Sequence, residues 1–199
     1  MQNNQALYHE ALQQLQRLID EAAARGVPEP HAAALATADA SARPSVRTVY
    51  IVAVEEPGLL FFANLQSGKS QQLLENPRAA LCFFWRDIQE QVIVEGEVVL
   101  QSAATSDSYW RRRAREAQLG AWVSRQGAPA PAKDQLHQQA RQLEQTLGFE
   151  PLARSALWHA FRILPERIEF WPSGWQRLRE RVRYSKDADG QWSREAVNP

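Results

Sequence analysis

The part of the chain that most restricts its fold is the stretch from residue 31 to residue 100, where short apolar runs alternate with clusters of turn-forming residues. The runs are rich in Val, Ile, Phe and Ala and cover residues 31–37, 45–54, 59–63, 79–85 and 91–100. Runs of this length and composition are typical of β-strands. Most of the turn-forming segments between these runs are long enough for a hairpin but too short for the crossover that parallel strands need. The stretch therefore predicts a mainly antiparallel sheet or barrel.

Helical patterns flank these strands. Apolar residues recur at steps of three and four from Leu7 to Ala22, which predicts an amphipathic helix over residues 4–25. Further helices are expected at 104–124 and 133–147. Strand-like runs then return at 157–164, 167–171, 176–184 and near Trp192, with Pro165-Glu166 as a turn. The layout belongs to the α+β class, and 199 residues suit a single domain.

Charge and composition exclude several classes of partner. The 23 basic and 23 acidic residues cancel, so no overall field favours nucleic acid or an anionic membrane. No segment approaches the ~18 apolar residues of a membrane-spanning helix, and the N-terminus lacks the pattern of a signal peptide. Cys82 is the only cysteine and has no partner for an internal disulfide. We therefore expect a cytoplasmic protein that binds neither membranes nor nucleic acid.

Motifs of the common catalytic classes are missing. The histidines, His9, His31, His137 and His159, share no metal-ligand spacing with Cys82, so no metal is expected. The sequence contains no Gly-x-Gly-x-x-Gly fingerprint, no P-loop and no Gly-x-Ser-x-Gly elbow. An enzyme without such groups would depend on a bound cofactor for its chemistry.

Three groups of basic residues are candidates for anion binding, and each also has a purely structural explanation. Arg47 interrupts an apolar strand, either as an edge residue that discourages aggregation or as a phosphate clamp. Lys69 lies where a small polar segment opens a short helix, which makes it part of a helix cap or of an anion site. Tyr109 and Arg113 are four residues apart and would share a helix face, although most basic runs of this kind are solvated.

Arginine occupies every second position in one segment near the C-terminus, at Arg177, Arg179, Arg181 and Arg183. If this segment is a strand, the guanidinium groups all leave the same face, because strand side chains alternate sides. Like charges on one face repel unless an anion or solvent balances them. The row therefore indicates either an anion at this face or a solvated surface.

Several motifs follow one another in a fixed order from about residue 27 to residue 199: they lie at 47–49, 62–69, 75–78, 91–96, 118–126, 168–171 and 177–181. In this order they resemble the pyridoxine (pyridoxamine) 5′-phosphate oxidase family. The resemblance implies an antiparallel split β-barrel with flanking helices, FMN as the cofactor, and a homodimer with FMN at the interface. It also implies one FMN-binding domain over residues 1–199, with a C-terminal region from about 157 to 199 for dimerisation and substrate binding.

The resemblance also implies roles for individual residues. The positions that match FMN contacts of the family are Arg47, Thr48, Val49, Phe62, Ala63, Lys69, Gln91, Gln126, Trp171 and Arg181. Within this set Arg47 and Lys69 match phosphate contacts, Gln126 comes from the facing subunit, and the others include the surroundings of the flavin ring. The positions that match substrate contacts are Tyr109, Arg113, Arg177 and Arg179, and the last two are expected to be catalytic.

The reaction that the resemblance implies is hydride transfer from the C4′ carbon of a pyridine substrate to flavin N5, which gives pyridoxal 5′-phosphate. Oxygen then reoxidises the flavin and hydrogen peroxide is released. This chemistry needs no strong nucleophile. It needs a substrate held by its phosphate at one end and by arginine near the ring at the other.

Substrate positions depart from the family pattern more than flavin positions do. Val52 stands where the family has a lysine, Ala117 where it has a serine and Arg179 where it has a histidine. Gly68 replaces an FMN-phosphate arginine, and the chain begins almost at its first helix, without the family's N-terminal arm. Arg183 matches no family role and is expected at the solvated end of the arginine row.

Three hypotheses therefore remain open. The chain is a divergent pyridoxamine-phosphate oxidase, an FMN oxidase of the same family that acts on another small anionic ring, or a flavin-binding protein without turnover. The phenazine-biosynthesis branch of the family also lacks the lysine that Val52 replaces, which favours it as the second hypothesis.

Overall fold

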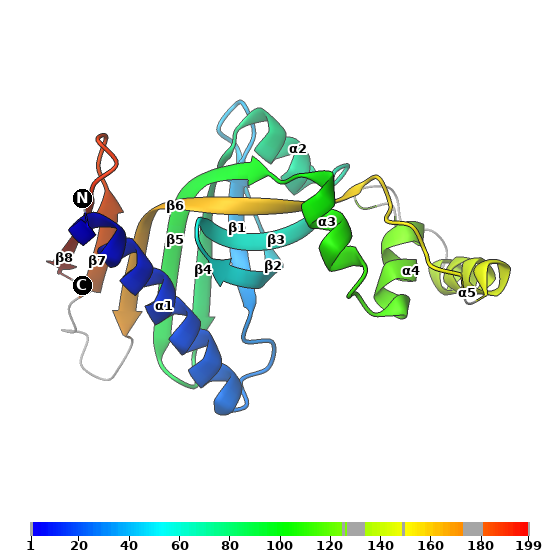
Figure 1. The fold of residues 1–199 in the computed structure, drawn as a ribbon, viewed down its shortest axis with the longest axis horizontal. Coiled ribbons are helices and arrows are strands. Elements are labelled where there is room, and N and C mark those ends of the chain that lie inside the picture. Colours follow the sequence, from blue (N-terminus) through cyan, green and yellow to red (C-terminus); the bar gives the residue numbers. More distant parts are fainter. Residues whose placement is uncertain (1, 125, 127–133, 149, 173–180, 199) are drawn as a thin grey trace. The chain divides into compact units, whose positions relative to one another are not determined.

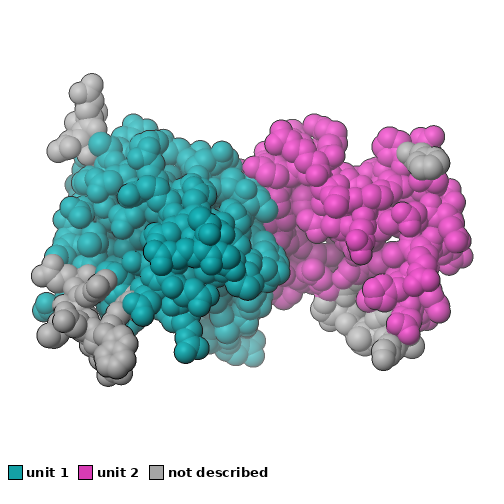
Figure 2. Space-filling view, turned by 90° about the horizontal axis from the view of Figure 1, so that it is seen from below, with its two compact units in different colours: residues 1–61, 72–99, 162–199 teal, residues 62–71, 100–161 magenta. Residues whose placement is uncertain are grey.

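The computed structural model describes residues 2–124, 126, 134–148, 150–172 and 181–198. The chain divides into two compact units (Figure 2). Unit 1 consists of residues 1–61, 72–99 and 162–199, and unit 2 of residues 62–71 and 100–161. Each unit is described by itself below.

Six antiparallel strands form a closed barrel, as the sequence predicts (Figure 1). Their bounds are Ala32–Ala38 (β1), Pro44–Glu55 (β2), Gly58–Asn64 (β3), Arg78–Trp85 (β4), Glu90–Leu100 (β5) and Trp158–Pro172 (β6). The order around the barrel is β3-β2-β1-β4-β5-β6, and pairing of β3 with β6 closes it. Each of the five strands expected between residues 31 and 100 is present, and its bounds differ from the predicted ones by one residue at each end or less.

Strand alternation separates a core face from an outer face in unit 1. Leu35, Ile51, Leu81 and Phe83 point inward and are fully buried. The outer face of β2 is apolar as well, since Val46, Tyr50 and Val52 are exposed. Exposed apolar side chains that gather on the outer face of a barrel strand are typical of a surface that a second protein covers.

The predicted turn at Pro165-Glu166 is wrong, because β6 runs through it without interruption. Glycines in the two neighbouring strands allow the close approach of β6 at this point. A Cβ atom on Gly58 in β3 would lie 1.9 Å from the carbonyl oxygen of Ile163, and one on Gly96 in β5 would lie 2.0 Å from that of Leu164. Side chains at these two positions would push β6 away, so the glycines permit one long strand where the local sequence indicates two.

The N-terminal helix lies against a C-terminal hairpin in unit 1 (Figure 1). Helix α1 (Gln2–Ala24) confirms the helix expected at 4–25, and it packs beside β7 (Arg181–Lys186) and β8 (Trp192–Val197). Tyr184 is fully buried there, and its hydroxyl donates to Glu10 Oε1 at 2.7 Å. Residues 176–180 of the strand predicted at 176–184 lie outside the described residues.

The helices that follow the barrel strands begin with α2 (Gly68–Glu75) and continue in unit 2 with α3 (Ala103–Trp110), α4 (Arg115–Val123) and α5 (Gln135–Leu147). The helical stretch expected at 104–124 is present as two separate helices, α3 and α4. The side-chain amide of Gln118 donates to the carbonyl of Trp110 at 2.7 Å and so caps the end of α3. Among the described residues, no helix has the length and apolar character needed to cross a bilayer.

Candidate functional site

Arg47 is a partly buried cation in unit 1 whose contacts are all neutral. It lies in β2 opposite Leu35 of β1, and its Nη1 donates to Thr37 Oγ1 at 2.5 Å and to the Leu35 carbonyl at 3.2 Å. Its Nη2 donates to Gln72 Oε1 at 3.2 Å. No carboxylate among the described residues pairs with it, and desolvation lowers the pKa of the guanidinium. The explanation of Arg47 as an edge residue is wrong, because β2 lies between β3 and β1.

A guanidinium has five N–H donors, and these contacts use three of them. Two donors therefore remain for a ligand, which matches the bidentate geometry in which arginine binds phosphate. The other barrel positions implied by the family resemblance are divided between the two faces of their strands. Thr48 is exposed on the outer face of β2, whereas Val49 and Ala63 are buried.

Lys69 lies in the first turn of α2, and the residues around it belong to unit 2. Its Nζ donates to Ser67 Oγ at 3.2 Å and to the side-chain oxygen of Gln126 at 3.4 Å. The two residues are 57 positions apart and in contact within one chain, whereas the resemblance implies that Gln126 reaches the FMN of the facing subunit. The amine is held by neutral oxygens at a helix N-terminus, an arrangement that favours an anion.

Tyr109 and Arg113 meet at an aromatic cluster of unit 2. Phe62 stacks on Trp158 with ring centroids 4.1 Å apart, and the Tyr109 ring lies 5.2 Å from Phe62. The Arg113 guanidinium lies 5.4 Å from the centre of the Trp158 ring, and desolvation lowers its pKa. The shared helix face predicted for Tyr109 and Arg113 is wrong, because α3 ends at Trp110; instead, each of the two side chains contacts one ring of the Phe62–Trp158 pair.

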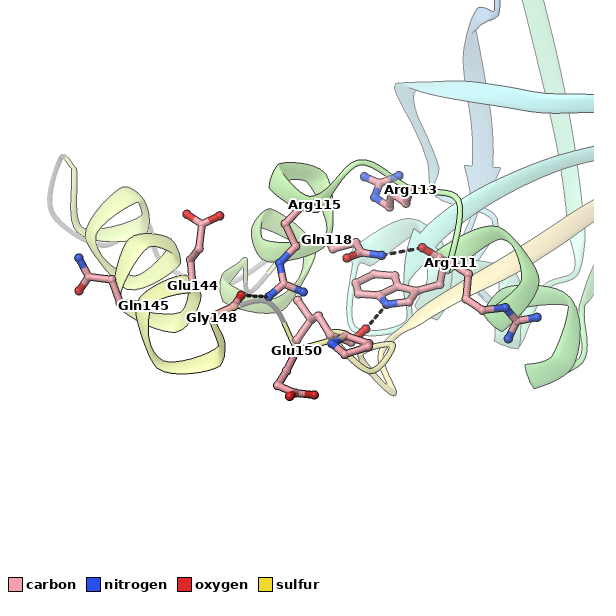
Figure 3. Close-up of a pocket in the computed structure, with 11 residues that line it drawn as sticks. Arg111, Arg113, Arg115, Gln118, Glu144, Gln145, Gly148 and Glu150 are labelled. Carbon is pink, nitrogen blue, oxygen red and sulfur yellow. Dashed lines mark hydrogen bonds between the residues drawn. The ribbon is translucent and has the colours of Figure 1, made fainter.

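A cavity of about 770 Å³ lies in unit 2 beside this cluster (Figure 3). Arg111, Arg113 and Arg115 line it, but Figure 3 shows that their side chains diverge. Arg115 donates to the carbonyl of Gly148 at 3.3 Å. Because the three cations do not converge, the cavity has no recognisable anion site.

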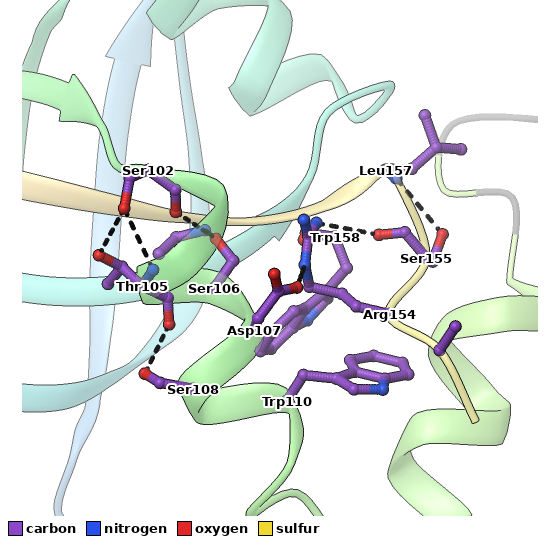
Figure 4. A network of polar contacts seen from close by, with 12 residues as sticks. Ser102, Thr105, Ser106, Asp107, Ser108, Trp110, Arg154, Ser155, Leu157 and Trp158 are labelled. Carbon is purple, nitrogen blue, oxygen red and sulfur yellow. Dashed lines mark hydrogen bonds and ion pairs between the residues drawn. The ribbon is translucent and has the colours of Figure 1, made fainter. Parts of the chain in front are cut away.

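A polar network fixes the chain just before β6 (Figure 4). Arg154 is nearly buried, and its Nε donates to Asp107 Oδ1 at 2.5 Å while Nη1 donates to the Trp158 carbonyl at 2.8 Å. Ser106 Oγ accepts from the backbone N–H of Ala160 at 3.1 Å. The sequence gives no sign of this network, because Arg154 and Asp107 are 47 residues apart.

Arg181 carries a buried donor for which the described part of the chain provides no acceptor. Its guanidinium lies 4.7 Å from the centre of the Trp171 ring, and Nη1 donates to Glu169 Oε1 at 3.1 Å. Its Nε is buried and has no hydrogen-bond partner among the described residues. A buried N–H without an acceptor is costly, so the side chain is suited to a ligand that offers one. A flavin ring, with its carbonyl oxygens and ring nitrogens, fits this requirement.

Of the remaining candidate residues, some lie in the described part of the chain and others do not. Gln91 lies in β5 opposite Phe84, whose ring is exposed on the outer face of β4. Arg177 and Arg179 lie outside the described residues. The expectation that Arg183 is solvated is wrong, because Glu169 and Glu195 both pair with it. Sequence reasoning missed Glu169, which has no distinguishing pattern around it.

Two family models match the chain. One, described as pyridoxamine 5′-phosphate oxidase, covers residues 19–147, and one described as the pyridoxine 5′-phosphate oxidase C-terminal dimerisation region covers residues 158–199. A pyridoxine/pyridoxamine 5′-phosphate oxidase of Rubrobacter xylanophilus is 39% identical over 94% of this chain and 86% of that protein. The protein of the same name from Anaeromyxobacter dehalogenans is 43% identical over 92% of this chain and 93% of that protein.

Solved structures agree with the fold. PhzG from Burkholderia lata, in complex with tetrahydrophenazine-1-carboxylic acid, has a TM-score of 0.87 at 28% identity and covers 94% of this chain and 91% of its own. A pyridoxamine 5′-phosphate oxidase-related, FMN-binding protein of Nostoc punctiforme has a TM-score of 0.70 at 20% identity, over 88% of this chain and 91% of its own. At that identity the second similarity shows the fold alone.

Proposed function

Because the chain belongs to the pyridoxamine 5′-phosphate oxidase family, we propose that it is an FMN-dependent oxidase that acts on a small anionic ring. The observation that carries the proposal is the pair of unsatisfied cationic groups in unit 1. Arg47 has two N–H donors left over and no acidic partner among the described residues, and Arg181 has a buried donor without an acceptor. Both need an electron-rich ligand.

We propose that the residues at the cofactor bind its two ends separately. Arg47 and Lys69 hold the phosphate, and Gln126 contacts FMN from the facing subunit. Arg181, Trp171 and Gln91 hold the ring, and the set is completed by Thr48, Val49, Phe62 and Ala63. When bound, FMN supplies the hydride acceptor and passes the electrons on to oxygen. The protein contributes orientation, and its arginines stabilise negative charge on the reduced ring.

For the substrate, we propose a B6 phosphate, oxidised to pyridoxal 5′-phosphate. Tyr109 and Arg113 would bind the phosphate, and Arg177 and Arg179 would act as the catalytic contacts beside the flavin. The aromatic cluster of Phe62, Tyr109 and Trp158 belongs to the core of unit 2, and its contacts hold Tyr109 and Arg113 in place.

A second substrate class deserves equal testing, because Val52 and Ala117 remove two polar contacts from the phosphate clamp. Each such contact is worth roughly 1–3 kcal/mol when buried. Their loss would weaken phosphate binding by about two to four decades. The similarity to PhzG, whose structure holds a carboxylic acid, favours a ring carboxylate as the alternative substrate. A flavin-binding protein without turnover is the third candidate.

We propose that the chain acts as a cytoplasmic homodimer with FMN at the interface, and as a single functional domain over residues 1–199. The match to a C-terminal dimerisation region supports the dimer, as does the exposed apolar row of Val46, Tyr50 and Val52 on β2. Neither a membrane nor a nucleic acid takes part in this proposal.

The test is oxygen consumption by the FMN-loaded protein. Pyridoxamine 5′-phosphate, pyridoxine 5′-phosphate and dihydro-aromatic carboxylates are offered in parallel, and peroxide is measured with each. Consumption with the B6 phosphates supports the first substrate class, and consumption with the carboxylates alone supports the second. FMN binding without any consumption supports the third candidate, and a protein that does not bind FMN overturns the proposal.

A further inference from the structure

Glu169 is an almost buried carboxylate that two arginines share. Its side chain is 8% exposed. Arg181 Nη1 donates to Oε1 at 3.1 Å, and Arg183 donates to Oε2 through Nε at 3.0 Å and Nη2 at 2.9 Å. Both oxygens of one carboxylate are therefore engaged, each by a different cation.

Strand pairing fixes this arrangement. Glu169 in β6 lies directly opposite Arg183 in β7, and Arg181 is two residues earlier on the same face of β7. On the opposite face Phe170 and Tyr184 are buried against each other, with ring centroids 5.8 Å apart. The register cannot shift without exposing these two rings, so Glu169 stays between the arginines.

The two arginines are held in different ways. Arg183 uses three donors, because it also approaches Glu195 at 3.6 Å through Nη1. Among the described residues, Arg181 has the Glu169 bond and the Trp171 ring as its contacts, and its buried Nε has no acceptor. Glu169 and Trp171 therefore fix the plane of the guanidinium of Arg181, whose side chain is 30% exposed and whose Nε is a buried donor without an acceptor among the described residues.

We propose that Glu169 is a positioning residue that aims Arg181 at the flavin ring and that limits the positive charge of this arginine pair. The inference rests on the proposed function, since it takes FMN as the ligand. Without the carboxylate, two guanidinium groups on one strand face repel each other, and Arg181 loses the one carboxylate that it contacts among the described residues. The same loss removes a negative charge that opposes formation of the anionic reduced flavin.

Two readouts other than turnover test the proposal. FMN-free protein is titrated with FMN and with riboflavin, which has the ring but no phosphate, and flavin fluorescence gives the two dissociation constants. In Glu169→Gln both constants should rise by the same factor, about tenfold or more, which corresponds to about 1.4 kcal/mol. The reduction potential of the bound flavin should become more positive.

Glu195→Gln is the matched control. It removes a carboxylate from the same hairpin that contacts Arg183 but not Arg181, so flavin affinity should change by less than about twofold, within the range of surface ion pairs. If flavin affinity falls as much in Glu195→Gln as in Glu169→Gln, the net charge of the hairpin determines flavin affinity and Glu169 has no special role.

A double variant separates position from charge and guards against misfolding of the single one. Glu169→Gln/Arg183→Gln removes one charge of each sign, so the pair of like charges no longer exists. Riboflavin affinity should still fall, because a neutral amide oxygen holds the Arg181 guanidinium more weakly than a carboxylate does, while the potential should return toward that of the parent. Parental affinity in this variant would overturn the positioning role.

The two proposals fail in different ways. If the unaltered protein binds neither FMN nor riboflavin, the proposed function is wrong and the inference falls with it. If the unaltered protein binds FMN and Glu169→Gln binds both flavins equally well at an unchanged potential, the inference alone is wrong.

Discussion

Replacing Arg47 by alanine removes the one cation that β2 places inside the barrel wall without a charged partner among the described residues. Three of its five N–H donors already go to Leu35, Thr37 and Gln72, which leaves two for a phosphate. A hydrogen bond to a charged group is worth about 1.5–3 kcal/mol. Because the guanidinium is only partly buried, we take about 2–4 kcal/mol for both bonds together, which corresponds to a rise of roughly 30- to 1000-fold in the dissociation constant for FMN.

The assay for Arg47→Ala is a fluorescence titration of the FMN-free protein with FMN and with riboflavin. Affinity for FMN should fall by the stated factor, whereas affinity for riboflavin should stay the same, because the lost bonds belong to the phosphate. Arg43→Ala is the control, since Arg43 is 81% exposed and pairs with Asp39 in the turn just before the same strand. Equal losses for FMN and riboflavin, or no loss for either, would refute the assignment of Arg47 to the phosphate.

Three further predictions address substrate choice and stability. Val52→Lys restores the lysine of the family at an exposed position. Because the lysine adds one charged contact to the substrate phosphate, kcat/KM for pyridoxamine 5′-phosphate should rise about tenfold or more. An unchanged kcat/KM would mean that Val52 does not limit substrate choice. Arg154→Ala leaves the chain before β6 without its ion pair and should lower the free energy of unfolding by about 2–4 kcal/mol in a denaturant titration, whereas Asp107→Asn, at the more exposed partner, should cost less. Burial and the bond to Glu10 raise the pKa of Tyr184 from 10.0 to about 12, so its contribution to stability is complete below pH 10 and is lost as the pH rises toward 12. Tyr184→Phe should therefore flatten the decline of stability between pH 10 and 12, and an unchanged slope would show that this hydroxyl does not titrate as described.

The strands of the barrel are predictable from the sequence because each carries its own signal. Short apolar runs between turn clusters locate β1 to β5, and the regular spacing from Leu7 to Ala22 locates α1. The boundaries of β6 and α3 differ from the sequence-based prediction because they depend on contacts with other segments of the chain. Gly58 and Gly96 allow β6 to pass Pro165 without a turn, and the side chain of Gln118 ends α3.

The candidate site is predictable in part for the same reason. Arg47, Lys69, Tyr109 and Arg113 stand out as polar residues in unusual local surroundings. Glu169 does not, because an acidic residue between apolar ones in a strand is common, and its importance appears only when β7 brings two arginines to it. Pairing across strands decides which charges are solvated, and a single sequence does not give that pairing for the arginine row.

The most direct test of the account is to add substrate to the FMN-loaded protein without oxygen and to monitor the absorbance of its flavin band. We predict a yellow protein that holds FMN after desalting, loses the band when pyridoxamine 5′-phosphate or a dihydro-aromatic carboxylate is added, and regains it when air is admitted. A protein that stays colourless after incubation with FMN, or a flavin band that no substrate of either class diminishes, would contradict an FMN-dependent oxidase built on these arginines.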